Sequence, residues 1–180
     1  MKMTRRRKPH PPKDKNVKLI PLTHGKFAIV DAEDYQYLVK YKWYISQDGN
    51  NFYAYAFLSK GNKKIKVFMH RMIMNAPKGL FIDHIDGNGL NNRRSNLRPC
   101  TPAQNVQNSR PRCNASSKYK GVFWNKTNKK WNATIHKGDN RIYLGGFDDE
   151  IEAALAYDRK AKELFGEFAY LNFRTTDSTD

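Results

Sequence analysis

Apolar and aromatic residues in the first part of the chain recur mostly at the spacing of strands. Residues 26–30 and 52–58 alternate or run apolar, and residues 46–51 between them are rich in turn formers. Residues 31–44 place their large side chains at helical spacing instead, and residues 65–74 begin like a strand and end like a helix. The pattern therefore predicts a β-rich region over residues 17–64 that includes one short helix.

Residues 81–108 predict a unit of strand, loop, strand and helix. Phe81–Ile82 begins the first strand, and the Gly- and Asn-rich residues 86–92 suit a turn with positive φ angles. The second strand is expected at residues 94–98. A helix follows with Thr101 as its N-cap, because a proline comes next and a glutamine lies three residues beyond the threonine.

The pattern changes in residues 118–174 to three short strands and one helix. The strands are expected at residues 120–124, 131–136 and 141–144. Asp148 is the expected N-cap of the helix, and Gly166 suits the position just after its end. The helix is rich in alanine and can lie close to one face of an antiparallel sheet, which leaves the other face polar and basic. Residues 111–117 contain little apolar surface and are expected to be a linker.

The net charge of the chain indicates the kind of partner it binds. The 180 residues contain 33 Lys and Arg against 17 Asp and Glu, a formal net charge of +16, which points to a polyanionic partner. Residues 1–16 have a net charge of +6, residues 17–116 of +9 and residues 117–174 of only +3. The first of these segments contains three prolines and little apolar surface, so it predicts a basic flexible arm. The expected fold class of the rest is α+β.

Composition also excludes several classes of protein. No apolar run approaches the roughly 20 residues that a membrane-spanning helix needs, and the basic N-terminus is not followed by the apolar segment of a secretory signal. Cys100 and Cys113 are too few for a disulfide framework and lack the spacing of a zinc site. We therefore expect a reducing compartment and no membrane partner.

The predicted strand–loop–strand–helix unit brings four polar residues together. Asp83 and Asn105 offer a carboxylate and an amide oxygen, which are hard ligands suited to Mg²⁺ or Mn²⁺. A neutral His84 beside such a cation could take a proton from water that attacks phosphorus, and Asn96 could hold the imidazole ring. Candidate phosphate-binding residues are Arg93, Arg94 and Arg98. Spacing alone leaves open a second interpretation, in which the polar residues only form turns and caps.

The segment DHIDGNGLNNRRSNLR, preceded by MHRMIM and followed by AQNVQN, resembles the HNH nuclease motif. It is most similar to the His-Asn-Asn form in phage and intron-encoded homing endonucleases. The resemblance implies a ββα-metal core at residues 65–110, within a nuclease domain over residues 17–110, that cleaves DNA with one divalent cation. It implies that His84 is the general base, that Asn96 orients His84, and that Asp83 and Asn105 bind the metal.

The motifs GVFW, KWNATI, LGGF, EAALAYD and GEFAYLNF in residues 118–174 resemble the plant ethylene-response-factor (Apetala) type of DNA-binding domain. That family lays a three-stranded sheet in the major groove and also occurs fused to HNH nucleases. The resemblance implies DNA contacts at Lys120, Phe123, Asn125, His136, Arg141 and Tyr143. Several of these side chains differ from those of the plant proteins, so the plant target sequence does not follow.

Together these features predict a site-specific DNA endonuclease of the homing type. We expect double-stranded DNA as the partner, Mg²⁺ or Mn²⁺ as the metal, no small-molecule cofactor, a monomer, and a location in the cytoplasm of a bacterial host cell. The alternative is a catalytically silent DNA-binding regulatory protein, which the charge and the C-terminal module fit equally well. The complete set of four candidate site residues favours the enzyme, because a decayed site should have lost at least one.

Overall fold

The computed structural model describes residues 14–49, 51–111 and 115–173. Most of the predicted basic arm, and Cys113, lie outside the described residues. The chain divides into two compact units between Cys100 and Thr101, whereas the sequence places a linker at residues 111–117. Both units contain helices and strands, which confirms the α+β class.

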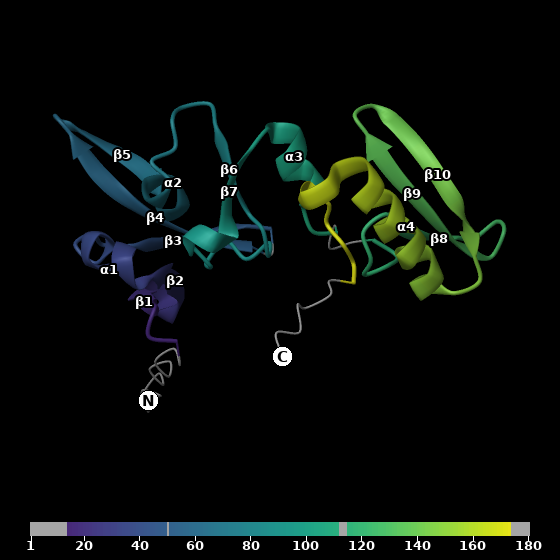
Figure 1. Cartoon of the computed structure of the whole chain (residues 1–180), viewed down its shortest axis with the longest axis horizontal. Helices are drawn as coiled ribbons and strands as arrows, with labels where there is room; N and C mark the ends of the chain where they lie inside the picture. The colour runs from purple at the N-terminus through teal and green to yellow at the C-terminus, as the bar shows by residue number, and fades with distance from the viewer. Residues whose placement is uncertain (1–13, 50, 112–114, 174–180) are drawn as a thin grey trace, which may run out of the picture. The chain divides into compact units, whose positions relative to one another are not determined.

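Three small antiparallel sheets and two short helices form the described part of the first unit (Figure 1). β1 (Val17–Pro21) pairs with β2 (Phe27–Asp31), and the short 3-10 helix η1 (Thr23–Gly25) lies between them. α1 (Ala32–Leu38) leads into β3 (Tyr44–Asp48), β4 (Asn51–Lys60) and β5 (Lys63–Phe68), which pair in that order. α2 (Met69–Ile73) begins directly after β5. These elements confirm the predicted strands, the predicted short helix and the change from strand to helix.

The third sheet is the hairpin of β6 (Phe81–His84) and β7 (Leu97–Cys100). The predicted start of the second strand is wrong, because residues 94–96 form the 3-10 helix η2 (Arg94–Asn96) and pairing begins only at Leu97. The Asn96 side chain forms hydrogen bonds within the loop between β6 and β7 instead, so it stabilises that loop. The loop is also tied to β2, since Ile29 donates to the Leu90 carbonyl and accepts from the Asn92 amide.

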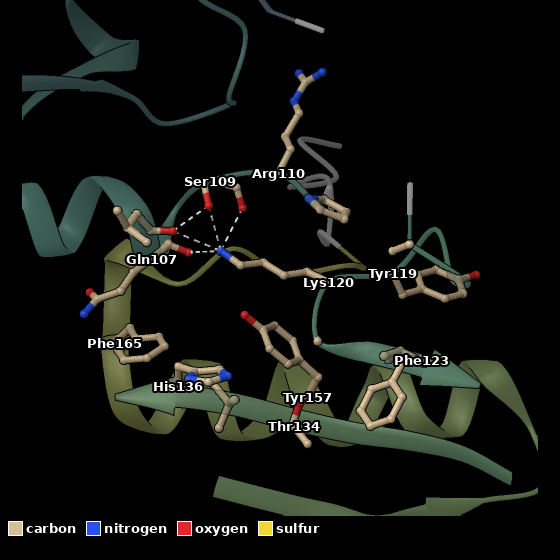
Figure 2. Close-up of a pocket in the computed structure, with 16 residues that line it drawn as sticks. Gln107, Ser109, Arg110, Tyr119, Lys120, Phe123, Thr134, His136, Tyr157 and Phe165 are labelled. Atoms are coloured by element: carbon tan, nitrogen blue, oxygen red, sulfur yellow. Dashed lines mark hydrogen bonds between the residues drawn. The ribbon is translucent and has the colours of Figure 1, made fainter. Parts of the chain in front are cut away.

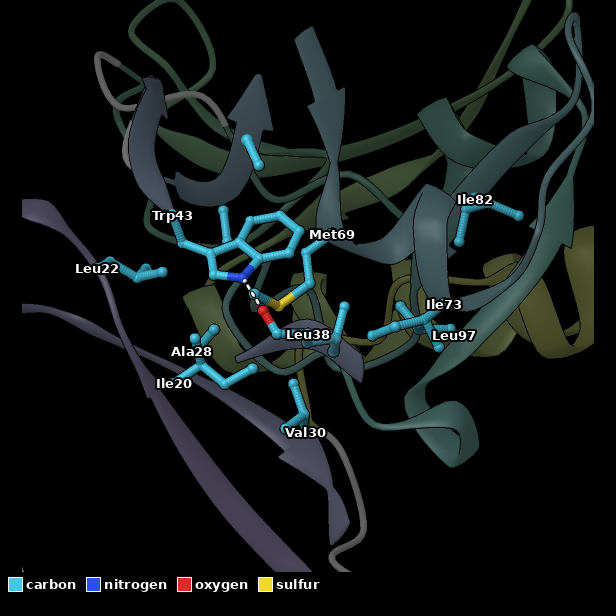
Figure 3. Close-up of a cluster of buried hydrophobic side chains, with 12 residues drawn as sticks. Ile20, Leu22, Ala28, Val30, Leu38, Trp43, Met69, Ile73, Ile82 and Leu97 are labelled. Carbon is cyan, nitrogen blue, oxygen red and sulfur yellow. Dashed lines mark hydrogen bonds between the residues drawn. The ribbon is translucent and has the colours of Figure 1, made fainter. Parts of the chain in front are cut away.

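One buried cluster connects these sheets with both helices (Figure 3). At its centre lie Trp43, Leu38 of α1 and Met69 of α2, and all three are buried. The indole Nε1 of Trp43 donates to the Leu38 carbonyl at 2.8 Å, which satisfies the one polar atom of that ring. Ile82 and Leu97 belong to the same cluster. The hairpin that carries His84 is therefore anchored in the core of the first unit.

The second unit begins with α3 (Pro102–Gln107), whose predicted capping box at Thr101 is confirmed. Its sheet contains β8 (Val122–Asn125), β9 (Lys130–Lys137) and β10 (Asn140–Phe147), with β9 in the middle. α4 (Glu150–Phe165) packs on that sheet and η3 (Gly166–Phe168) follows it. The structure confirms the predicted three-stranded antiparallel sheet with one helix.

Small residues let α4 approach the sheet closely. Ala153, Ala154 and Ala161 are completely buried, and they pack with Val122, Ala133 and Ile135 of the sheet. The predicted N-cap Asp148 is wrong by one residue, because the Asp149 carboxylate accepts from the amides of Ile151 and Glu152. Among the residues that the structure describes, no helix combines the length and apolar character needed to cross a membrane.

Gly121, at the start of the second unit's sheet, is a position where only glycine fits. Its φ angle is 78°, and an added Cβ would overlap the Tyr157 ring and lie 2.6 Å from the Thr134 carbonyl oxygen. We expect Gly121→Ala to lower the free energy of unfolding by about 2–4 kcal/mol, from backbone strain and overpacking together. Denaturant unfolding followed by circular dichroism measures this. Gly138→Ala is the matched control, because Gly138 has φ 60° and open space around its Cβ position; an equal loss in both variants would contradict the packing argument.

Candidate functional site

His84 is the last residue of β6 and is buried. Its Nε2 lies 3.4 Å from Oδ1 of Asn92, and an amide oxygen can only accept, so this contact places the ring proton on Nε2. Nδ1 is then the nitrogen with a lone pair. Burial lowers the pKa of His84, while Asn92, Asp86 and Asp83 oppose that shift. The net direction favours the neutral imidazole that a general base requires.

The Asn96 side chain makes hydrogen bonds within the loop that follows His84. Its Nδ2 donates to Asp86 Oδ1 at 3.0 Å and to the Asn91 carbonyl at 2.8 Å, while its Oδ1 accepts from the Asp86 amide. The side chain that lies against His84 Nε2 is that of Asn92, a completely buried residue that was not among the predicted site residues. Its one sequence signal was its place in the Asn-rich loop, which predicts turn chemistry rather than burial. That Asn96 orients His84 stays a prediction.

Asp83 precedes His84 in β6 and is buried. Its Oδ2 accepts from Nε and Nη2 of Arg98, the residue directly opposite in β7, at 3.0 and 2.8 Å. Within the described residues no group of three or more His, Cys, Asp or Glu side chains could enclose a metal. Mg²⁺ in nucleotide-processing sites is commonly held by one or two protein oxygens plus phosphate and water, so a single carboxylate is compatible with that ion.

Asn105, the second predicted metal ligand, lies in α3 and is half-buried. α3 belongs to the second unit, whereas Asp83, His84 and Asn96 belong to the first. The structure therefore brings three of the four predicted site residues into one hairpin and its loop. The metal-binding roles of Asp83 and Asn105 remain predictions.

All three arginines predicted to bind phosphate form ion pairs inside the first unit. Arg93 pairs with Asp31 at 2.9 Å, Arg94 with Asp34 at 2.7 Å, and Arg98 with Asp83 at 2.8 Å. The Arg98 side chain is only 11% exposed, while those of Arg93 and Arg94 are 35% and 47% exposed. Arg93 and Arg94 fix the loop to β2 and α1, and Arg98 joins the two strands of the hairpin, while phosphate contact stays a prediction.

A second histidine lies against His84. The rings of His70 and His84 meet edge to face with centroids 5.1 Å apart, and Tyr53 is in ring contact with both. Burial, with smaller contributions from His84 and Arg71, lowers the pKa of His70 to about 3. His70 Nδ1 is buried without a hydrogen-bond partner in the described part of the chain. His70 therefore lies beside His84 as a buried, neutral ring.

Five of the six residues predicted to contact DNA in the second unit share one face of its sheet. The strand register and the alternation of side chains place Phe123, Asn125, His136, Arg141 and Tyr143 on the same side. Tyr143 is 59% exposed, and the guanidinium carbon of Arg141 lies 5.4 Å from the Phe123 ring centroid. Packing of α4 uses the other face, so this one is polar and basic as predicted.

Lys120, the sixth residue predicted to contact DNA, makes hydrogen bonds within the second unit. Its Nζ donates to the carbonyls of Val106, Gln107 and Ser109 at 3.2, 2.7 and 2.8 Å, and burial lowers its pKa to about 8 (Figure 2). The ammonium group therefore satisfies the C-terminal end of α3, where free carbonyls favour a cation. The residues that make these bonds line part of a cleft of about 710 Å³. The bonds attach α3 to the sheet module. DNA contact by Lys120 remains a prediction.

Comparison with known proteins agrees with both halves of this architecture. Residues 75–107 match the family model described as HNH endonuclease, and residues 117–167 match the AP2 domain. An HNH endonuclease of Acanthamoeba polyphaga mimivirus is 35% identical over 150 residues, which cover 82% of this chain and 75% of the relative. The chain therefore belongs to the HNH endonuclease family, with an AP2 domain in its second unit.

Two further relatives each match one part of the chain. Protein 3.8 of Escherichia phage T7 is 36% identical over 93 residues, covering 52% of this chain and 76% of the phage protein. Dehydration-responsive element-binding protein 2D of Arabidopsis thaliana is 49% identical over 61 residues, covering 33% of this chain and 29% of the plant protein. These relatives come from viruses and a plant, so they do not support the expected bacterial host.

His70 should make stability depend on pH. The unfolded chain protonates this imidazole below about pH 6.5, whereas the folded protein resists protonation until about pH 3. The stability contribution is therefore complete above pH 6.5 and is lost as the pH falls. At pH 5 the loss is about 2 kcal/mol. We expect His70→Phe, which keeps a ring but cannot titrate, to lose less stability than the parent between pH 7.5 and 5 in denaturant unfolding; parallel profiles would contradict the assignment.

Proposed function

We propose that this HNH endonuclease is a site-specific, homing-type enzyme that hydrolyses phosphodiester bonds of double-stranded DNA with a single Mg²⁺ or Mn²⁺. The observation that carries the proposal is the buried, neutral His84 at the end of β6, beside the Asp83 carboxylate and with its Nε2 proton directed to Asn92. A general base must be unprotonated and held in one orientation; burial of His84 favours the unprotonated form, and the contact with Asn92 holds the ring.

In the proposed reaction, Nδ1 of His84 takes a proton from the water that attacks the phosphorus. The water oxygen would bond to phosphorus as the P–O3′ bond breaks, and the leaving O3′ would take a proton from solvent, which gives a 5′-phosphate and a 3′-hydroxyl. Asp83 and Asn105 would hold the divalent cation, which supplies charge stabilisation at the phosphate when bound. Arg98 supports this role by holding the Asp83 carboxylate in a fixed orientation through two hydrogen bonds.

Choice of the DNA site is assigned to the sheet face of the AP2 domain. Arg141, His136 and Asn125 offer donors on one face, where the Tyr143 ring is also exposed. An exposed three-stranded sheet can enter the major groove, where base edges differ. The net charge of +6 on residues 1–16 would add sequence-independent attraction to phosphates.

The second candidate is a DNA-binding regulator without cleavage activity. The AP2 face and the charge fit this regulator equally well, but the first unit also contains features that DNA binding alone does not require. His84 is buried with a lowered pKa, and Asn96 and Asp86 close the loop around it. Asp83, His84, Asn96 and Asn105 are all present, which favours the enzyme.

Replacing His84 tests the chemical proposal. We expect His84→Ala to reduce cleavage of a target plasmid by at least about a hundredfold, because general-base catalysis contributes roughly 10²–10⁴-fold. DNA affinity should stay within a few fold, since a neutral imidazole makes no ion pair with phosphate. Gel analysis of cleavage and fluorescence anisotropy of binding, both with Mg²⁺ present, measure the two effects. His24→Ala, at an exposed histidine outside the site, is the control. Full activity of His84→Ala would sink the proposal.

Replacing Arg141 tests the targeting role. We expect Arg141→Ala to lower the preference for target over unrelated DNA by roughly tenfold or more, because one good contact to a base edge discriminates by about 1–3 kcal/mol. Sequencing of cut ends from a plasmid library shows the preference. Arg159→Ala removes the same charge from α4, outside the sheet face, and should leave the cleavage pattern intact. Identical patterns for the two variants would argue against recognition by this face.

A further inference from the structure

The sheet of β3, β4 and β5 has an aromatic face that the nuclease chemistry does not use. The strand register places Tyr44 opposite Tyr55 and Tyr55 opposite Phe68, with Phe57 further along β4 on the same side. The opposite face supplies the core, because Ala54 is buried in the main cluster. We call these four rings and Lys66 the aromatic face.

The rings of this face are in contact and lead to His84. Tyr44 stacks on Tyr55 with centroids 5.6 Å apart, and Phe57 meets Tyr55 edge to face at 5.6 Å. Tyr55 contacts Phe68 at 6.3 Å, Phe68 stacks on His70 at 5.5 Å, and His70 contacts His84 at 5.1 Å. A continuous row of rings thus runs from the exposed part of the sheet to the candidate general base.

The face is exposed and positively charged. Phe57 is 48% exposed, and the tyrosines and Phe68 are half-buried. Lys66 Nζ lies 4.1 Å from the Tyr55 ring centroid and 4.8 Å from that of Phe68. The register places Lys64 on the same side as Lys66, and both lysines are exposed; the acidic residue on that side of the three strands is Asp48, near the end of β3. A group of large, partly exposed rings beside two lysines is unusual for a face with only a solvent role.

We propose that the aromatic face binds unstacked nucleotides of the cleaved strand next to the scissile phosphate. Nucleobases stack on aromatic rings without regard to sequence, and a row of rings beside lysines is the arrangement that binds single-stranded nucleic acid. Charge complementarity selects a polyanion over an apolar partner, and continuity with His84 selects the strand being cut. A duplex keeps its bases covered, so the enzyme would hold a locally opened stretch of DNA there.

This inference rests on the proposed function only for the position of the cut, and it is tested without cleavage. Fluorescein-labelled oligothymidylate is mixed with the full chain in EDTA, and anisotropy gives its affinity. We expect Phe57→Ala to weaken binding by roughly tenfold, because stacking is worth about a factor of 5–150 per base. Phe57→Trp should retain binding, since any aromatic ring serves. Tyr37→Ala, at an exposed tyrosine on α1, is the matched control and should bind as the parent does.

Crosslinking locates the contact independently. Oligothymidylate with one 5-iododeoxyuridine reacts on irradiation with a ring stacked against it, and mass spectrometry identifies the peptide. We expect adducts within residues 44–68. Adducts confined to other residues, no binding of oligothymidylate by the parent, or an effect of Phe57→Ala on duplex DNA alone would each overturn the proposal. A nuclease-dead parent that still binds through this face would instead refute the proposed function and leave the inference standing.

Discussion

The arrangement around His84 depends on closing the long loop between β6 and β7. That loop has no regular pairing of its own, so side-chain amides replace a sheet ladder: Asn96 bonds to Asp86 and to the Asn91 carbonyl, and Asn51 of β4 bonds to the Gly87 carbonyl and the Gly89 amide. Backbone bonds to Ile29 tie the same loop to β2. Buried amides satisfied in this way stabilise one loop conformation, because each would be costly if left unpaired.

The three arginines of the first unit that were predicted to bind phosphate form ion pairs within the protein. Arg93, Arg94 and Arg98 each hold a carboxylate, and the pair of Arg98 with Asp83 is the most buried of them. Removing one partner of such a pair would leave a buried charge uncompensated, which is strongly unfavourable. The lysines of residues 60–66 are exposed in contrast, so they are the part of the positive charge best placed to meet phosphates.

Within the second unit, α3 is attached to the rest of the fold by hydrogen bonds. Lys120 from the AP2 domain covers the end of this helix, and the amide of Tyr170 donates to the Gln107 carbonyl. α3 carries Asn105, a residue that the proposed mechanism places at the metal.

The sequence by itself determined the elements and the families. Strand alternation in β4 and β9, the capping box at Thr101 and the alanine-rich α4 follow from local spacing, so they were predicted correctly. The family motif also indicated His84 and its companions. Only the tertiary structure decided the partners of polar groups, because those depend on how loops and neighbouring elements fold against one another: Asn92 at His84, Asp34 at Arg94 and the α3 carbonyls at Lys120. Periodicity reports which face a side chain occupies; it contains no information about which distant group will meet it there.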